Sequence, residues 1–394
     1  WLHHFLDGLE QSQVVTAVTF SQHRARVASQ GTVFLPTGSY MEMAEWSLPT
    51  HTAVDYENVL ERLKQVDLHS QARPFVRGGI FRNFLAKYSE SAWMHARMLD
   101  LAQRGKTQKL SALAQAGFTD FLQRSQANDA YWHGVFGGLY LPHLRHAIFQ
   151  NLLAAERLLP RKKTPSVEER QLVGQALPLL LLKSDQLFSV WSPHEGTCLE
   201  LSNLSREFCV SNVLTRREEP YHRKVAHATS AYDSDSGSIH EQIRAKEDGL
   251  QAYLRYDPSP RRGAMDALCN VPQGPSLQDC QQSRWEQELV YRFVKENKGF
   301  AAESDSPIAF KQLRWIAADR IQVVLEVQTS DSTPLWVGQG WHWSMHTAAS
   351  SDRYIETHGG QQTQRHSPAA EIQAELSRFR MVNEWDKLAF GLQS

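Results

Sequence analysis

Hydrophobic positions follow a helical period between about residues 79 and 159. Apolar side chains recur there every three or four residues, first at Phe84, Tyr88, Trp93, Met94, Met98 and Leu101, and again at Leu141, Leu144, Ile148 and Leu152. A period of 3.6 residues places such side chains on one face of a helix. We therefore expect several helices that pack together in a small bundle.

The second half of the chain alternates apolar and polar residues with a period of two. The apolar residues Ile321, Val323, Leu325 and Val327 alternate with the polar residues Gln322, Glu326 and Gln328. The segments 289–293 and 341–345 show a similar alternation. Because successive side chains of a strand point to opposite faces of a sheet, this pattern predicts half-buried strands in an antiparallel β-sandwich.

A charged segment separates the two patterns. Residues 160–170 contain two prolines and show no apolar periodicity, which is typical of a linker. We place the linker at 160–175 and a second domain at 176–394. The polar stretches 230–238 and 359–368 are expected to be long loops of that domain.

Near the beginning of the chain, a strand and a helix are expected around a short loop. The apolar run Thr32 to Leu35 is followed by Pro36-Thr37-Gly38-Ser39 and then by good helix formers from Tyr40 to Leu48. This order predicts a strand, a loop and a helix. In α/β folds, loops beyond the carboxyl ends of strands carry functional groups, because the sheet holds them beside an open crevice. Residues 37–46 take that position.

Charge and length exclude several classes of protein. The 394 residues include 42 Lys and Arg and 43 Asp and Glu, so the formal net charge is −1. Proteins that bind nucleic acid through phosphate contacts normally have a basic excess, and nucleic acid is not expected as a partner. An apolar content of 41% fits two or three domains of about 150 residues each. One of the most apolar stretches, 176–182, is far shorter than the ~18 residues needed to cross a bilayer, and no membrane span is expected.

The amino terminus and the cysteines give an expectation for the cellular location of the protein. Residues 1–6 have no initiator Met, no basic segment and no long apolar segment, so the sequence is expected to begin within a longer protein and to have no signal peptide. The four cysteines, Cys198, Cys209, Cys269 and Cys280, show no CxxC spacing and are too few for a disulfide framework. They predict reduced, buried thiols and a cytoplasmic protein.

The near-neutral net charge permits association without requiring it, so the oligomeric state stays open.

The first candidate site is the segment 40–46. Glu42, Glu45 and Trp46 are three or four residues apart, and on a helix they share one face. Carboxylates that bind hydroxyl groups, beside an indole that stacks on C–H faces, suit a sugar ring. The same spacing also fits the amphipathic start of a helix with acids near the positive end of its dipole. The two methionines of the segment are expected on its buried side.

The second candidate site is the segment 128–134. Asp129 is followed by Trp132 at i+3 and by His133 at i+4, within glycine-rich backbone. The alternative is a helix start in which one of the first two residues is the cap and the aromatic residues belong to the core. On the residues alone, that alternative is favoured.

Other patterns predict no site. The histidine pairs His3/His4, His143/His146 and His342/His346 have neither an HExxH pattern nor a cysteine set nearby, so no metal is predicted. Residues 134–138 lack the spacing of a phosphate-binding loop and no GxSxG occurs, so no nucleotide, no other cofactor and no serine nucleophile is expected. Trp341 and Trp343 are expected to pack in the core rather than to form an exposed surface for sugars.

The segment 35–49, Leu-Pro-Thr-Gly-Ser-Tyr-Met-Glu-Met-Ala-Glu-Trp-Ser-Leu-Pro, resembles the late barrel motif of glycoside hydrolase family 57, in particular its 4-α-glucanotransferase and α-amylase branch. Further stretches are similar in the same order. Residues 79–88 and 94–99 resemble the helical domain of that branch, and residues 128–145 resemble its last conserved region. Residues 214–222 and 256–257 are similar to its β-sandwich, and the resemblance is weakest after Leu335.

This resemblance implies a multidomain fold of α and β structure. It places the end of an incomplete (β/α)7 barrel at residues 1–76, a helical bundle domain at 77–159 and, after the linker, an antiparallel β-sandwich at 176–394. It also implies action on α-1,4-glucans, or maltooligosaccharides, by a retaining double displacement with one carboxylate as nucleophile and another as acid/base. In the family both carboxylates precede the Met-Glu-Met motif. Neither Asp7 nor Glu10 lies in the family's aspartate motif, so both catalytic groups are expected upstream of Trp1 and none on this segment.

The resemblance further assigns substrate contacts and an activity. The expected contacts are Glu42, Glu45 and Trp46 from the first segment and Asp129, Trp132 and His133 from the second. The parent protein is expected to be a 4-α-glucanotransferase or an α-amylase of starch or glycogen metabolism, and the residues do not separate the two. The alternative is a non-catalytic glucan-binding or scaffold module, inactive because both catalytic carboxylates are missing.

Overall fold

The structure is a computed structural model that describes residues 1–35, 38–133, 137–161, 164–225, 249–269, 292–296, 299–303, 308–328, 336–346, 350–360, 362–370, 372 and 374–393. The chain divides into two units, Trp1–Ser39 and Tyr40–Ser394, and each is described by itself.

The first unit contains two short helices, α1 (Leu2–Glu10) and α2 (Phe20–Arg26). α2 begins at a capping box in which Thr19 and Gln22 bind each other's backbone N–H groups, which satisfies donors that a helix start otherwise leaves free. The strand predicted at Thr32–Leu35 is wrong, because these residues are irregular and Phe34 is 95% exposed. A strand is held by hydrogen bonds to a neighbouring strand, and the described part of residues 1–76 contains helices and irregular segments but no strand.

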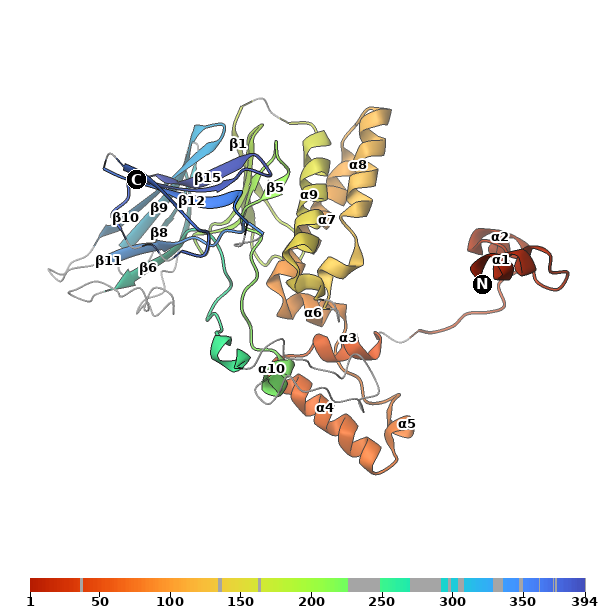
Figure 1. The fold of residues 1–394 in the computed structure, drawn as a ribbon. Helices are drawn as coiled ribbons and strands as arrows, with labels where there is room; N and C mark the ends of the chain where they lie inside the picture. Colours follow the sequence, from red (N-terminus) through yellow and green to blue (C-terminus); the bar gives the residue numbers. More distant parts are fainter. Residues whose placement is uncertain are drawn as a thin grey trace. The chain divides into compact units, whose positions relative to one another are not determined.

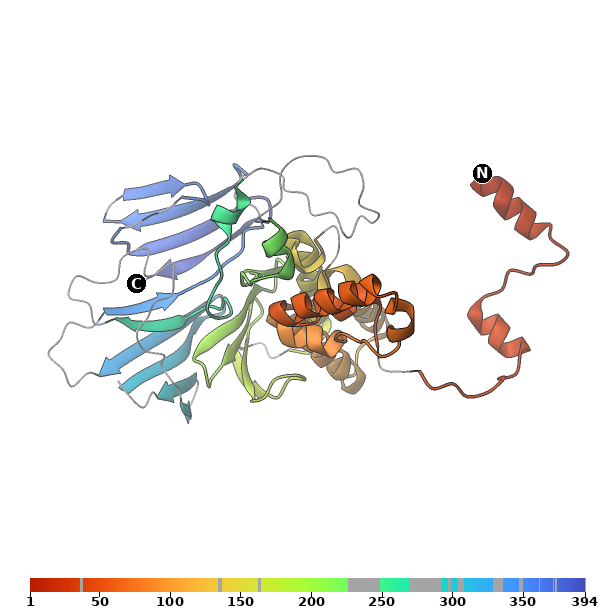
Figure 2. The ribbon, with the colours of Figure 1, turned by 90° about the horizontal axis from the view of Figure 1, so that it is seen from below.

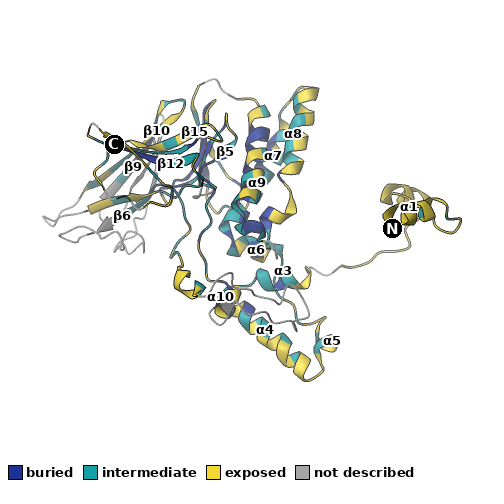
Figure 3. Cartoon of the chain, viewed as in Figure 1, coloured by how far each residue is buried: buried dark blue, intermediate teal, exposed yellow. Residues whose placement is uncertain are grey.

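The second unit begins with helices that continue to residue 158. They are α3 (Met41–Trp46), α4 (Thr50–Gln65), α5 (His69–Ala72), α6 (Phe81–Lys87), α7 (Ser89–Thr107), α8 (Ala112–Arg124), the 3₁₀ turns η1 (Asn128–Tyr131) and η2 (Gly138–Tyr140), and α9 (Pro142–Leu158). α7, α8 and α9 contact one another (Figure 1). Figure 3 shows buried residues concentrated in α7 and α9, whereas α4 is mostly exposed.

The predicted helical period is confirmed, with one break. Of the residues on the predicted apolar face, Phe84, Trp93, Met94 and Leu101 are buried and Met98 packs against the same core. The run is not one helix, because Tyr88 has extended backbone and separates α6 from α7. Periodicity does not reveal such a break, since Tyr88 is itself buried in the same core.

The first sheet has five antiparallel strands in the order β1-β2-β3-β4-β5. They are β1 (Ser166–Arg170), β2 (Leu179–Lys183), β3 (Leu187–Ser192), β4 (Thr197–Asn203) and β5 (Phe208–Cys209). The structure corrects the predicted linker at 160–175, because residues 166–170 form β1 and pair with β2. A short charged edge strand has no apolar alternation of its own, and its hydrogen bonds to β2 hold it in place.

The remaining strands form three further sheets, and all their pairings are antiparallel among the described residues. The first, in the order β10-β9-β8-β7, contains β7 (Arg292–Glu296), β8 (Gly299–Glu303), β9 (Ile308–Ala317) and β10 (Arg320–Gln328). The second pairs β6 (Met265–Cys269) with β11 (Trp336–Gly340), and the third contains β12 (Arg353–Gly359), β13 (Gln362–His366), β14 (Arg378–Asn383) and β15 (Leu388–Gln393). The short helix α10 (Pro220–Val225) and the turn η3 (Leu250–Tyr253) precede these sheets.

The predicted alternation holds on β10, where Ile321, Val323, Leu325 and Val327 are partly buried and the polar residues between them are exposed. The predicted strand at 341–345 is wrong, because β11 ends at Gly340 and the next residues are irregular. Part of the predicted segment 289–293 and the predicted loop 230–238 lie outside the described residues. The predicted loop 359–368 contains strand β13 instead.

A buried ion network joins the helices to the first sheet. The guanidinium of Arg97 on α7, with 0% exposure, lies 3.0 Å from Glu200 on β4 and 3.4 Å from Glu156 on α9. Trp93 donates to Glu200 over 2.9 Å, and Lys183 lies 3.3 Å from Glu156. Burial raises the pKa of Glu200 despite the neighbouring Arg97. Buried charges need such partners, so the network fixes the helices against the sheet.

The two cysteines whose side chains are described agree with the prediction of buried thiols. Cys198 and Cys209 are free and buried, and burial raises the pKa of each thiol to about 12. The side chain of Cys269 and the whole of Cys280 lie outside the described part.

Within the described ranges, no helix combines the length and the apolar character that a membrane crossing requires.

Candidate functional site

The first candidate segment forms α3, which is held by a close backbone contact. The N–H of Gly79 donates to the carbonyl oxygen of Ala44 over 2.8 Å. A Cβ atom on Gly78 would lie 2.3 Å from the same oxygen, so only glycine permits this approach. Ser47 closes the helix by donating its hydroxyl to the carbonyl of Met43 over 2.7 Å. This anchoring fixes the orientation of Trp46, which is the last residue of α3.

The second candidate segment folds back on itself between η1 and η2. The N–H of Leu139 donates to the carbonyl oxygen of Trp132 over 2.7 Å. Gly138 has φ +48°, and a Cβ atom there would lie 2.2 Å from the Trp132 oxygen. The glycine that breaks a regular helix in the sequence thus allows η2 to pack against the backbone of Trp132 and His133.

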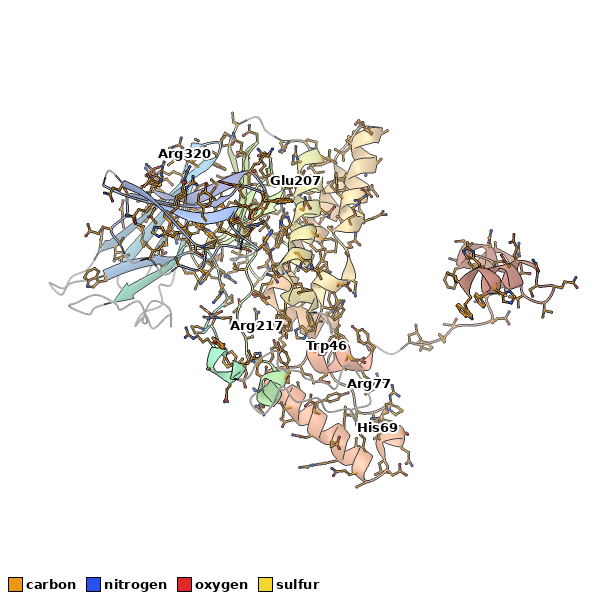
Figure 4. All side chains as sticks on the ribbon, in the orientation of Figure 1. Trp46, His69, Arg77, Glu207, Arg217 and Arg320 are labelled. Atoms are coloured by element: carbon orange, nitrogen blue, oxygen red, sulfur yellow. The ribbon has the colours of Figure 1, made fainter. Side chains whose placement is uncertain are left out.

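The two segments meet through their aromatic rings. The ring centroids of Trp46 and His133 are 5.7 Å apart. Trp132 packs on Phe81 at 4.3 Å and on Phe84 at 5.1 Å. We name seven of the rings at this place the aromatic cluster: Trp46, Phe81, Phe84, Tyr88, Trp132, His133 and Tyr140. Trp46 and Trp132 are half-buried, so each keeps part of its surface accessible. Figure 4 marks Trp46 on α3.

His133 is held as a neutral imidazole inside the aromatic cluster. Its ring lies 4.7 Å from Tyr88 and 5.0 Å from Tyr140, centroid to centroid. Burial lowers the pKa of His133 to about 4, and the effect of Glu219 in the opposite direction is smaller. Its Nε2 is buried and makes no hydrogen bond within the described part of the chain. A neutral imidazole fits among rings because burying a charged one would be costly.

A buried carboxylate that the sequence analysis missed holds the aromatic cluster in place. Glu219, only 1% exposed, accepts hydrogen bonds from the hydroxyls of Tyr88 and Tyr140, both over 2.7 Å. Lys87 donates to the same carboxylate over 3.1 Å and to the carbonyl of Trp46 over 3.4 Å. The pKa values of Tyr88 and Tyr140 are raised, first by burial and then by neighbours that include Glu219. Glu219 follows Tyr88 by 131 residues, and a contact over that separation leaves no periodic signal.

The three predicted carboxylates differ in exposure. Glu42 and Glu45 are partly buried on α3, and Asp129 is exposed on η1. The pKa of Tyr56 is raised by burial and then by Glu45, which puts Glu45 near α4. The structure thus brings the two segments together through Trp46 and His133, while Asp129 stays at the exposed side of η1.

The predicted burial of the two methionines is half correct. Met43 is fully buried and Met41 is 39% exposed. Residues two apart on a helix point in different directions, so the short α3 cannot bury both. The alternative of a capped helix start at η1 is also half correct, because Tyr131 is buried but no side-chain cap is formed.

Two histidines from different pairs named in the sequence analysis meet in space. His146 on α9 and His346 lie 4.1 Å apart, ring centroid to centroid, and Phe208 stacks on His346 at 4.7 Å. His143 is exposed, and His342 contacts the carbonyl of Arg262 over 2.9 Å. No group of three or more His, Cys, Asp or Glu side chains is arranged to hold a metal within the ranges that the structure describes.

Trp341 and Trp343 pack inside, as predicted. The ring centroid of Trp341 lies 6.1 Å from that of Trp191, and Trp343 lies 5.1 Å from Phe390. Both indoles are partly buried against hydrophobic clusters of the strands.

Comparison with known proteins identifies the family. The middle domain of the α-amylase/4-α-glucanotransferase family matches residues 79–159, and its C-terminal domain matches residues 180–394. The chain belongs to this family, and the resemblance seen in the sequence is confirmed.

The individual relatives are named either as alpha-amylase or as 4-alpha-glucanotransferase. Alpha-amylase 1 of Dictyoglomus thermophilum is 32% identical over 368 residues, which cover 89% of this chain and 52% of that protein. The 4-alpha-glucanotransferase of Thermococcus litoralis is 35% identical over 261 residues, which cover 65% of this chain and 38% of that protein. The crystal structure of 4-alpha-glucanotransferase from Thermococcus litoralis superposes with a TM-score of 0.67 at 26% identity, over 90% of this chain and 54% of that one. The chain thus spans about half, or less, of the length of these relatives.

Proposed function

We propose that this chain supplies one wall of an α-1,4-glucan-binding cleft in an enzyme of the 4-α-glucanotransferase or α-amylase type. The observation that carries the proposal is the contact of Trp46 with His133, which unites two segments about eighty positions apart in one aromatic cluster. Indole faces stack on the C–H faces of sugar rings, and carboxylates accept their hydroxyl groups. The names of the family and of its relatives support a glucan as the ligand.

Each residue of the two segments has its own role in this proposal. Trp46 and Trp132 stack on glucose units, and Glu42, Glu45 and Asp129 accept hydrogen bonds from hydroxyl groups. His133 is neutral because burial lowers its pKa to about 4, so it supports the rings without attracting a counter-ion. The two carboxylates of the retaining mechanism are not among these residues. In this assignment residues 1–76 belong to the end of a barrel, 77–159 to a helical bundle and 176–394 to a β-sandwich.

The test is binding of maltoheptaose to the 394-residue chain, measured by calorimetry. Trp132→Ala should weaken binding by roughly 1 to 3 kcal/mol, because a stacked sugar ring is lost. Trp385→Ala is the matched control, since this indole is 78% exposed between β14 and β15 and is not part of the aromatic cluster. An unchanged affinity of Trp132→Ala would contradict the assignment.

Product analysis tests whether the two catalytic carboxylates lie on this chain. Incubation of the chain with maltoheptaose should give binding without turnover if the catalytic carboxylates lie on a part of the protein that this chain does not contain. Turnover by the chain would show that a catalytic pair is present on it, which would refute this division of roles.

A further inference from the structure

A second acidic and aromatic surface follows Glu219 in the chain. Tyr221 and His222 belong to α10, and Tyr256 comes shortly after η3. The rings of His222 and Tyr256 are nearly parallel, with an interplanar angle of 16° and centroids 5.6 Å apart. Tyr221 is 37% exposed and Tyr256 is 44% exposed. These three residues are named the outer shelf.

Hydrogen bonds hold the rings of the outer shelf in place. The backbone N–H of Glu219 donates to Nδ1 of His222 over 3.1 Å, and the hydroxyl of Tyr256 lies 3.0 Å from the same nitrogen. Both contacts meet at Nδ1, whose role toward the Tyr256 hydroxyl depends on the tautomer of the imidazole. A ring fixed in this way loses little side-chain entropy when a ligand stacks on it.

An exposed carboxylate stands beside the outer shelf. Glu218 is exposed, and its charge contributes to the raised pKa of Tyr256, after burial. The backbone at Glu218 is anchored, because its carbonyl oxygen accepts from the hydroxyl of Thr50 at the start of α4 over 2.6 Å. Figures 1 and 2 show α10 beside α4. The surface therefore offers a flat ring and an acceptor for hydroxyl groups, which is the combination that suits a sugar.

One residue connects the outer shelf to the aromatic cluster. The carboxylate of Glu219 binds the hydroxyls of Tyr88 and Tyr140 in the cluster, and its backbone N–H binds His222 in the shelf. Glu219 is thus a buried residue that contacts both aromatic surfaces.

We propose that the outer shelf is a second α-1,4-glucan contact, which receives the part of a long chain that extends beyond the aromatic cluster. The proposal rests on the proposed function, because the cluster must hold a glucan for the chain to reach the shelf. Tyr256 stacks on a sugar ring, and Glu218 accepts hydrogen bonds from its hydroxyl groups. A short oligosaccharide fills the aromatic cluster without reaching the shelf.

The experiment compares maltoheptaose with maltotriose by calorimetry on the full 394-residue chain. Tyr256→Ala should weaken maltoheptaose binding about three- to tenfold, the loss expected for one aromatic contact, and should leave maltotriose binding unchanged. Tyr256→Phe keeps the ring and should bind like the parent chain. Tyr256→Leu keeps an apolar side chain without a flat ring, and should therefore behave like Tyr256→Ala. Circular dichroism confirms that each variant is folded.

The outcomes separate the two proposals. Selective loss of maltoheptaose affinity in Tyr256→Ala and Tyr256→Leu, with Trp385→Ala unaffected, supports the outer shelf. Parent-like affinity of both variants, while Trp132→Ala is weakened, overturns the outer shelf and leaves the aromatic cluster as the glucan site. Equal weakening in Tyr256→Ala and Trp385→Ala also overturns the shelf, because the effect would not be specific. No binding of maltoheptaose by the parent chain overturns the proposed function and the shelf together.

Discussion

Replacement of Glu219 by alanine tests whether one buried carboxylate organises the aromatic cluster. The change removes the acceptor of three side-chain hydrogen bonds, from Tyr88 and Tyr140 over 2.7 Å and from Lys87 over 3.1 Å. Tyr88 is 1% exposed and cannot turn to water, whereas Lys87 and Tyr140 are only partly buried. Removing one partner of a buried charged contact costs about 3 to 5 kcal/mol. We expect a loss near the lower end of that range, because two of the three donors can reach solvent.

The measurement is urea unfolding followed by far-ultraviolet circular dichroism, which reports on helices such as α6 and α7 on either side of Tyr88. Both tyrosine hydroxyls donate to the same carboxylate oxygen of Glu219, and Lys87 donates to the other one. Glu219→Gln keeps an acceptor oxygen for the two tyrosines and loses only the charged contact with Lys87, so it should lose roughly half as much stability. Glu218→Ala is the matched control, since the neighbouring carboxylate is exposed, and surface changes usually stay within about 0.5 kcal/mol. A Glu219→Ala variant as stable as Glu218→Ala would refute the reasoning.

Two further predictions concern other parts of the second unit. Arg97→Met should destabilise the chain by about 3 to 5 kcal/mol, because Glu156 and Glu200 lose a buried partner. The control Arg124→Met removes an exposed i,i+4 ion pair and should change the urea unfolding midpoint little. Similar midpoints for both variants would contradict a stabilising role of the buried ion network. His346 should make stability depend on pH, because burial, with His146 and Arg353, lowers its pKa from 6.5 to about 3. Its folded-state pKa is below the unfolded one, so the contribution is complete above about pH 6.5 and is lost as the pH falls toward 3. His346→Asn, which tolerates the positive φ of this position, should flatten that loss in urea midpoints measured between pH 7 and pH 4, and an unchanged slope would exclude His346 as its source.

The helical positions were predictable because their signal is local. Phe84, Met94 and Leu101 repeat with the period of a helix, and all three are buried. The alternation of β10 was predictable for the same reason. The acidic and indole spacing around Trp46 also indicated the correct helix, since α3 covers Met41–Trp46.

The missed features depend on partners that are distant in sequence. β1 is charged and short, and it is a strand because β2 pairs with it. His146 and His346 are 200 residues apart in sequence and meet only through the fold. Glu219 contacts Tyr88 across 131 residues. In contrast, the apolar run at Thr32–Leu35 has the local signal of a strand and forms none, because a strand needs a neighbour to bind its backbone groups.

The shared interior of the helices and the first sheet has a consequence for how this protein can be divided. Leu101, Ile148 and Leu152 of the helices belong to the same hydrophobic cluster as Leu181 and Phe188 of the strands. The segments matched by separate family domains, 79–159 and 180–394, are therefore a single piece in physical terms. Excision of either segment would expose part of this common interior to water, so an engineered version has to keep both segments together.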